Sequence, residues 1–290
     1  MFVRNLEWHA VNGDIIRFGK EPPYLLDRFV PGTPSGNAET VRAVRADGQT
    51  TYHVAAEPLT PSLTGTLVGV GGTHKEKQTS LDRQRLRLQA ALDPKRFGTL
   101  VFTNFAGAFK LRCRPLAGAN FGKRFAETHP ISIDWMSDDP YWTERDERTL
   151  SVGLVHKLWR FPWAIAPTVF GAITNEGTIN NPTHLDIYPT IVLSDTESES
   201  ITVGNATTGE FVTITHTIQR GQRLVLDMSK PSVTLVDADG AETDVMHWTT
   251  LDSIFPWAVV PGDNAIYSNV DNPELSPVIR LSWYLPEVGL

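Results

Sequence analysis

Short runs in which apolar and polar residues alternate make up most of the chain. In residues 129–137, Ile131, Ile133 and Trp135 alternate with polar neighbours. Because successive side chains of a strand point to opposite faces, this run predicts a strand with one buried face. Runs of the same kind recur at 14–18, 39–44, 98–104 and 108–114 in the first half, and at 190–193, 200–203, 210–216, 222–227, 233–236, 265–270 and 278–284 in the second.

One segment has a helical period instead. Within residues 79–92, Leu81, Leu88, Ala91 and Leu92 recur at spacings that share one helical face. The apolar pattern predicts no second helix of this quality. Short strands divided by 22 glycines and 20 prolines, together with one helix, indicate a mainly β protein.

The ends of this helix and its polar face carry further signals. Thr79 or Ser80 is a suitable N-cap, and Pro94 follows closely enough to end the helix. The polar face carries a set of three arginines, Arg83, Arg85 and Arg87. Planar guanidinium groups suit carboxylates across an interface, so these three are the candidate intersubunit contacts.

The chain divides into two predicted domains. The segment 138–148 is charged and rich in turn residues, and it lacks the apolar periodicity of both flanks. We therefore predict domains at 1–148 and 149–290. The second contains seven or more short strands with no helix between them, which predicts an antiparallel β-sandwich and excludes a parallel sheet.

Composition and charge narrow the class of protein. The 290 residues are 41% hydrophobic and 20% charged, as in soluble globular proteins. No apolar run is long enough to span a membrane, and the N-terminus lacks a signal peptide, so synthesis in a cytoplasm is expected. The single cysteine, Cys113, excludes an intramolecular disulfide. A formal net charge of −7 argues against nonspecific binding to nucleic acid or anionic membranes.

Motifs for catalysis or cofactor binding are weak throughout. The glycine-rich residues 69–75 match no phosphate-binding pattern and favour a flexible turn. Residues 237–244 lack the spacing of a calcium loop and favour a hairpin turn at Asp239-Gly240. The eight histidines form no close pair, although a metal site assembled from distant strands stays open. We therefore predict no catalytic, cofactor-binding or metal-binding residues, and we predict that the protein is not an enzyme. The competing hypothesis is a polysaccharide-cleaving enzyme with a pair of carboxylates, which only distances in a structure could reveal.

Three aromatic residues are candidates for glycan contact. Trp248, Trp257 and Tyr267 lie in the predicted sandwich, where aromatic rings can stack on sugars. Core anchoring is the commoner use of such residues. A carbohydrate-binding module that contacts host-surface glycans is therefore the alternative function.

Several segments, taken in order, are similar to the distal tail protein of long-tailed bacteriophages, the Dit or siphovirus tail component family. The segments that carry the resemblance are 88–94 with 98–102, 129–142, 175–177, 205–209, 221–227 and 261–266. The resemblance implies an N-terminal split β-barrel with one helix, six copies of which close into a ring, and a C-terminal galectin-like β-sandwich that projects outward.

The resemblance also implies the function. It predicts a structural tail-tip protein, a homohexameric hub that joins the tail tube to the baseplate or adsorption apparatus of a siphovirus virion. Its expected partners are the tail tube protein, the tape-measure protein, the tail hub and receptor-binding or fibre proteins. DNA would pass through the ring without specific binding, along a neutral or acidic inner wall, and no cofactor or membrane is expected.

Overall fold

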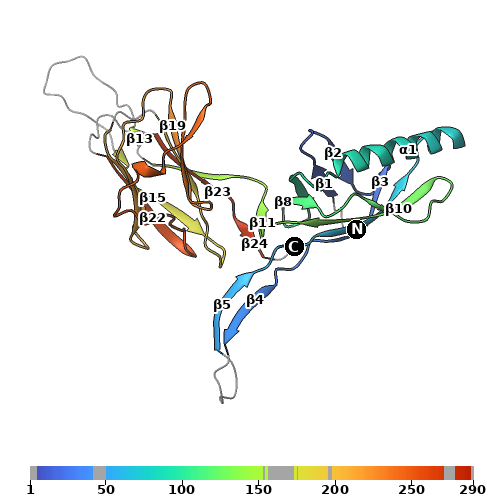
Figure 1. Cartoon of the computed structure of the whole chain (residues 1–290), viewed down its shortest axis with the longest axis horizontal. Coiled ribbons are helices and arrows are strands. Elements are labelled where there is room, and N and C mark those ends of the chain that lie inside the picture. Colours follow the sequence, from blue (N-terminus) through green and yellow to red (C-terminus); the bar gives the residue numbers. More distant parts are fainter. Residues whose placement is uncertain are drawn as a thin grey trace. The chain divides into compact units, whose positions relative to one another are not determined.

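A computed structural model describes residues 5–41, 50–152, 154–155, 173–174, 176–194, 198–270 and 278–288. Asn175, which opens one of the segments that carry the resemblance, lies outside this set. The chain forms two compact units (Figure 1): unit 1 is Met1–Asp146 with Pro286–Leu290, and unit 2 is Glu147–Leu285. The sequence assigned 286–290 to the second domain. The structure places 286–288 in unit 1, because β24 (Pro286–Glu287) pairs with β11 (Trp142–Glu144).

Unit 1 is built on one antiparallel sheet with the strand order β2-β1-β7-β8-β10-β6-β3. β9 pairs with β10, and β11 pairs with β8. β2 and β3 are the two ends of this strand order. One parallel bridge, between Gly19 after β2 and Leu25 in β3, connects these ends, and the described strands do not close a barrel. The strands are β1 (Asn5–His9), β2 (Ile15–Phe18), β3 (Tyr24–Val30), β4 (Gly36–Val41), β5 (Thr50–Ala56), β6 (Ser62–Val68), β7 (Gly98–Thr103), β8 (Ala108–Pro115), β9 (Asn120–Phe121) and β10 (Thr128–Met136).

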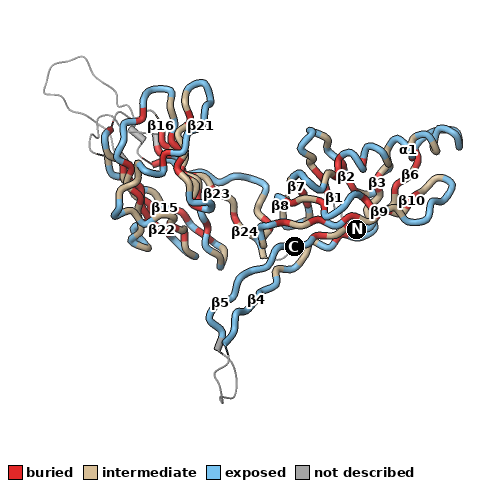
Figure 2. Tube along the Cα trace, viewed as in Figure 1, coloured by how far each residue is buried: buried red, intermediate tan, exposed pale blue. Residues whose placement is uncertain are grey.

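The alternating pattern of β10 produces the face that the sequence predicts. Ile131, Ile133 and Trp135 are buried, whereas Asp134 is exposed. The Trp135 ring lies 6.0 Å from the ring of Trp8 on β1, at the centre of the core of unit 1. Figure 2 shows buried positions gathered along the strands of each unit. The mainly β fold with one α-helix among the described residues is confirmed.

Helix α1 (His74–Ala91) begins five residues before its predicted start. Its N-cap is Thr73, not Thr79 or Ser80: the Thr73 hydroxyl accepts the Glu76 amide, and the Glu76 carboxylate accepts the Thr73 amide. These two bonds satisfy N–H groups that the first helical turn leaves without partners. The first turns were missed because they carry no apolar residue. Leu81, Leu88 and Ala91 are buried as predicted.

Unit 2 is a sandwich of two antiparallel sheets, with strand orders β12-β23-β16-β19-β20-β21 and β15-β22-β17-β18. Their inner faces share one apolar core, which confirms the predicted sandwich. A further pair joins β13 to β14. The elements are β12 (Arg148–Val152), β13 (Leu154–Val155), β14 (Ile173–Thr174), β15 (Glu176–Asn181), β16 (Thr190–Ser194), β17 (Ile201–Asn205), β18 (Glu210–Ile214), β19 (Arg223–Asp227), β20 (Ser232–Val236), β21 (Glu242–Asp244), the 3-10 turn η1 (Met246–Trp248), β22 (Gly262–Val270) and β23 (Val278–Trp283).

Candidate assembly surfaces

The hairpin of β4 and β5 has no buried face. Every residue of β4 is exposed, and so is every residue from 51 to 56 on β5 (Figure 2). Val41, Tyr52 and Val54 expose 55%, 70% and 60% of their surface. A two-stranded hairpin is at best marginally stable in water unless one of its faces packs on something. The described chain provides no such packing, so this hairpin is the first candidate for contact with another molecule.

The three arginines of α1 do not lie on one surface. The Arg85 guanidinium carbon lies 4.7 Å from the centre of the Phe121 ring, and Arg87 Nη2 lies 3.3 Å from Asp14 Oδ1. Arg83 is exposed and has no ion pair with any described residue. Successive helical residues are rotated by about 100°, so Arg85 points away from the face shared by Arg83 and Arg87. The intersubunit contacts of Arg83, Arg85 and Arg87 stay a prediction, and Arg83 is the one of the three without an ion pair or ring contact to a described residue.

Ion pairs fasten the first half of α1 to the loop before β10. Glu127 accepts hydrogen bonds from Lys77 Nζ at 2.8 Å and contacts His74 Nδ1 at 3.2 Å. These contacts, first that of Lys77, lower the pKa of the Glu127 carboxyl below its usual value. Arg124 Nη1 donates to Asp82 Oδ1 at 2.8 Å. Much of the polar face of the helix is thus engaged within unit 1.

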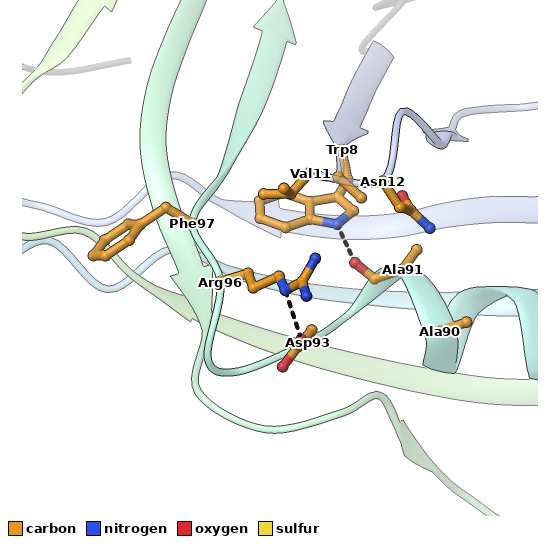
Figure 3. Close-up of a pocket in the computed structure, with 9 residues that line it drawn as sticks. Trp8, Val11, Asn12, Ala90, Ala91, Asp93, Arg96 and Phe97 are labelled. Atoms are coloured by element: carbon orange, nitrogen blue, oxygen red, sulfur yellow. Dashed lines mark hydrogen bonds and ion pairs between the residues drawn. The ribbon is translucent and has the colours of Figure 1, made fainter. Parts of the chain in front are cut away.

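A small hollow opens where the end of α1 meets the turn between β1 and β2 (Figure 3). Its volume is about 60 Å³, and Trp8, Val11, Ala90 and Ala91 provide most of its apolar lining. Trp8 Nε1 donates to the Ala91 carbonyl at 2.8 Å, which fixes the indole against the helix end. Pockets for small-molecule substrates are usually about 300–1,000 Å³. This hollow is large enough only for one small side chain.

The sequence motifs that resembled catalytic or ligand sites have structural roles. A Cβ on Gly69 would lie 2.3 Å from the Lys77 carbonyl oxygen, so glycine there permits close packing against α1. Asp239-Gly240 forms the turn between β20 and β21, with a φ of 87° at Gly240. Cys113 is buried, and burial raises the pKa of its thiol. The described residues hold no group of three or more His, Cys, Asp or Glu side chains placed to bind a metal ion.

The three aromatic residues proposed for glycan contact are in different environments. Trp257 is 1% exposed and belongs to the core of unit 2, so its predicted contact with a glycan is wrong. The His216 ring stacks on Trp248, with ring centres 3.7 Å apart. Tyr267 is half-buried, and its ring lies over Gly204, where an added Cβ would be 2.7 Å from the tyrosine Cε1. Both remaining aromatic rings are therefore already packed within the chain.

Two segments that carry the family resemblance meet at a buried hydrogen-bond network. Asn205 and Asn264 are both 0% exposed, and Asn205 Nδ2 donates to Asn264 Oδ1 at 2.9 Å. Asn205 also donates to the Ala258 carbonyl and accepts from the Thr207 amide. Asn264 in turn binds the backbone of Val260. These asparagines hold the loop before β22 against β17, and the spacing of the motifs gave no sign of that role.

Among the described residues, α1 lacks the apolar length that crossing a membrane requires, and no other helix is long enough. Its polar residues and ion pairs instead match a helix with one face on a protein core.

Comparison with known proteins finds one family model and several solved structures that are similar to this chain. Residues 183–277 match the model of the siphovirus-type tail component, C-terminal domain. No curated protein sequence matches the chain. The solved Dit protein of phage SPP1, described as a paradigm of the hub adsorption apparatus in phages that infect Gram-positive bacteria, aligns with 98% of this chain and 99% of its own, at 13% identity and a TM-score of 0.66.

Two further structures have the same fold. A chain of the phage P2 baseplate in its activated conformation with Ca covers 99% of this chain and 100% of its own, at 8% identity and a TM-score of 0.55. The corresponding structure with Sr covers 97% and 98%, at 8% identity and a TM-score of 0.52. The similarity includes both units, and the family model independently identifies the second. Residues 183–277 are therefore similar to the C-terminal domain of the siphovirus-type tail component, and the chain as a whole has the fold of the solved Dit protein.

Proposed function

We propose that this chain is a structural distal tail protein that forms a homohexameric hub at the tail tip. There it joins the tail tube to the baseplate or adsorption apparatus. The observation that carries the proposal is the family match over residues 183–277, within a chain whose fold aligns nearly end to end with a hub protein. A mounting role also agrees with the exposed β4–β5 hairpin, which offers a contact for another chain.

The β4–β5 hairpin supports assembly with neighbouring copies. Its exposed Tyr52 and Val54 lie two residues apart on β5, where a β-bulge leaves Tyr52 without a partner residue on β4. Exposed apolar residues clustered on a protruding element mark interaction sites more often than isolated ones do. In a closed ring each copy presents the same hairpin to a different surface of the next copy, so the same two surfaces recur at every interface.

The partners of such a hub would be the tail tube protein, the tape-measure protein, the tail hub and receptor-binding or fibre proteins. DNA would pass through the ring without specific binding. The net charge of −7 supports this, because tight binding to duplex DNA requires clustered cations along the path. The protein would act in the virion after synthesis in the host cytoplasm.

Native mass spectrometry and electron microscopy of the purified chain test the ring. We expect a species of six 32.2 kDa chains that appears as a six-fold ring. Tyr52→Ser with Val54→Ser should abolish it while leaving the circular dichroism of the monomer unchanged, since both residues are exposed there. Leu251→Ser is the matched control, because Leu251 is fully exposed at 103% in unit 2. Rings of three-fold or no symmetry would contradict the proposal.

A glycan-binding module remains a prediction with reduced support. Trp257 lies in the core, and Trp248 and Tyr267 each pack on a neighbour within unit 2. A glycan array probed with the full chain would detect such binding. Reducing-sugar release would likewise detect polysaccharide cleavage, which the structural role does not require.

A further inference from the structure

Two arginines of unit 1 stack on one phenylalanine ring. Arg112 and Arg114 occupy alternate positions of β8, so both side chains leave the same face of the sheet. Their guanidinium carbons lie 4.3 Å and 5.6 Å from the centre of the Phe97 ring. The phenylalanine face attracts both cations and holds them close together. We call Phe97, Arg112 and Arg114 the arginine pair surface.

This surface has positive charge without a matching carboxylate. Neither Arg112 nor Arg114 forms an ion pair with any described residue, whereas Arg17, Arg87, Arg96 and Arg124 each do. Two cations held side by side repel each other, and an anion placed between them would relieve the repulsion. A concentration of positive charge is also unusual in a chain whose formal net charge is −7. The arrangement therefore favours an anionic partner.

The hollow of Figure 3 extends this surface on one side. Phe97 lines the hollow together with the ion-paired Asp93 and Arg96, and Arg112 and Arg114 stack on its ring, so the hollow and the cationic part share one residue. Val11 and Ala90 at the hollow are exposed, Val11 by 59%. A volume of about 60 Å³ is suited to one aliphatic side chain. A ligand that fills both parts must combine an aliphatic group with negative charge.

The geometry points to a docking site for an acidic polypeptide segment, in which one aliphatic side chain enters the hollow and flanking carboxylates pair with Arg112 and Arg114. Guanidinium groups bind carboxylates through two parallel hydrogen bonds, which would fix the direction of the segment. A polypeptide fits better than duplex DNA, because a phosphate backbone has no aliphatic group for the hollow and the acidic chain repels a long polyanion.

The source of the segment is another tail protein. This identification rests on the proposed hub function. In that function the β4–β5 hairpin contacts neighbouring copies, so other tail proteins must bind to other surfaces. The docking chemistry itself does not depend on ring formation, and the two can be tested separately.

Fluorescence anisotropy of a labelled Glu-Glu-Leu-Glu-Glu pentapeptide, titrated with the full chain at low salt, tests the site. We expect saturable binding that Arg112→Gln with Arg114→Gln weakens about tenfold. Arg124→Gln removes one positive charge from an arginine paired elsewhere in unit 1 and should leave binding unchanged. Ala90→Leu should fill the hollow. It should therefore weaken binding of the leucine peptide but not binding of a peptide with serine in place of leucine.

Several results would overturn the inference. One is the absence of binding by the wild-type chain; another is equal binding by the arginine double variant. Tighter binding of a 12-base-pair DNA duplex than of the peptide would assign the surface to nucleic acid. Loss of the six-fold ring in the arginine double variant would assign it to contacts between copies. A wild-type chain that forms no ring but binds the peptide through these arginines would contradict the proposed hub and leave the docking site standing.

Discussion

Replacing Asn205 by alanine tests whether the residues that carry the family resemblance stabilise the fold. The Asn205 amide donates to the Ala258 carbonyl and to Asn264 Oδ1, both at 2.9 Å, and accepts from the Thr207 amide at 3.0 Å. Each buried hydrogen bond contributes about 1 kcal/mol net, so their loss should cost about 3 kcal/mol. The true cost includes partners left unsatisfied in the core, which adds to this value rather than reducing it.

Scanning calorimetry of the full chain measures the effect. A unit of about 140 residues has an unfolding entropy near 0.3 kcal/mol/K at its midpoint, so the Asn205→Ala transition should fall by about 10 °C. Asn180→Ala is the matched control: that asparagine donates to Asp263 on the surface, and its loss should shift the midpoint by less than about 2 °C. Leu88→Ala should move the transition of unit 1 and so identify which transition belongs to unit 2. Equal shifts for the two asparagine variants would refute the structural role.

Five further substitutions test other parts of the structure. Thr73→Ala should cost about 1 kcal/mol in urea unfolding and Thr79→Ala less than about 0.5 kcal/mol, because only Thr73 caps α1; the reverse order would restore the predicted cap. Leu88→Asp should destabilise unit 1 by on the order of 4 kcal/mol, and an unchanged midpoint would mean that Leu88 is exposed. Gly204→Ala should cost about 1–3 kcal/mol, because the added methyl overlaps an aromatic ring; full wild-type stability would show that the ring moves freely. The lowered pKa of Glu127 means that its contribution to stability is present above about pH 4.3, its unfolded value, and is lost as pH falls through the folded value. Glu127→Gln should therefore reduce stability at pH 7 but not at pH 2, and an equal loss at both values would contradict the ionic origin.

The sequence predicts the fold where one face of an element is buried. The alternation of Ile131, Ile133 and Trp135 in β10 and the helical spacing of Leu81 and Leu88 are local consequences of packing on a core, so they can be found without the structure. The first turn of α1 cannot be predicted in this way. Its stability comes from a capping box at Thr73 and from ion pairs, and neither produces an apolar period in the sequence. Residues 286–288 belong to unit 1 because β24 pairs with β11, a strand that lies far away in the sequence.

The candidate surfaces were harder to predict from residue types. Trp257 and Trp248 look alike in the sequence, yet the first is in the core and the second is stacked by His216, because burial depends on which strands lie above them. In the sequence, Arg112 and Arg114 are two ordinary polar positions of an alternating strand. Their proximity to Phe97 follows from the loop that precedes β7, which approaches β8 only after folding. The alternation in β8 predicts that both arginines share one face of the sheet, but it does not predict the ring that holds them together.

The proposed ring would require only weak contacts between its copies. An exposed ion pair contributes about 0.5 kcal/mol, which is too little to hold two isolated chains together. In a closed ring of six copies the same pair occurs six times, so one such contact adds about 3 kcal/mol per ring without any change in the chain. Once the ring has formed, a partner that binds one copy also finds the equivalent site on the next copy at high effective concentration. A hub can therefore depend on modest surfaces such as the β4–β5 hairpin and the arginine pair surface, whereas a catalytic centre requires several groups held in one exact arrangement.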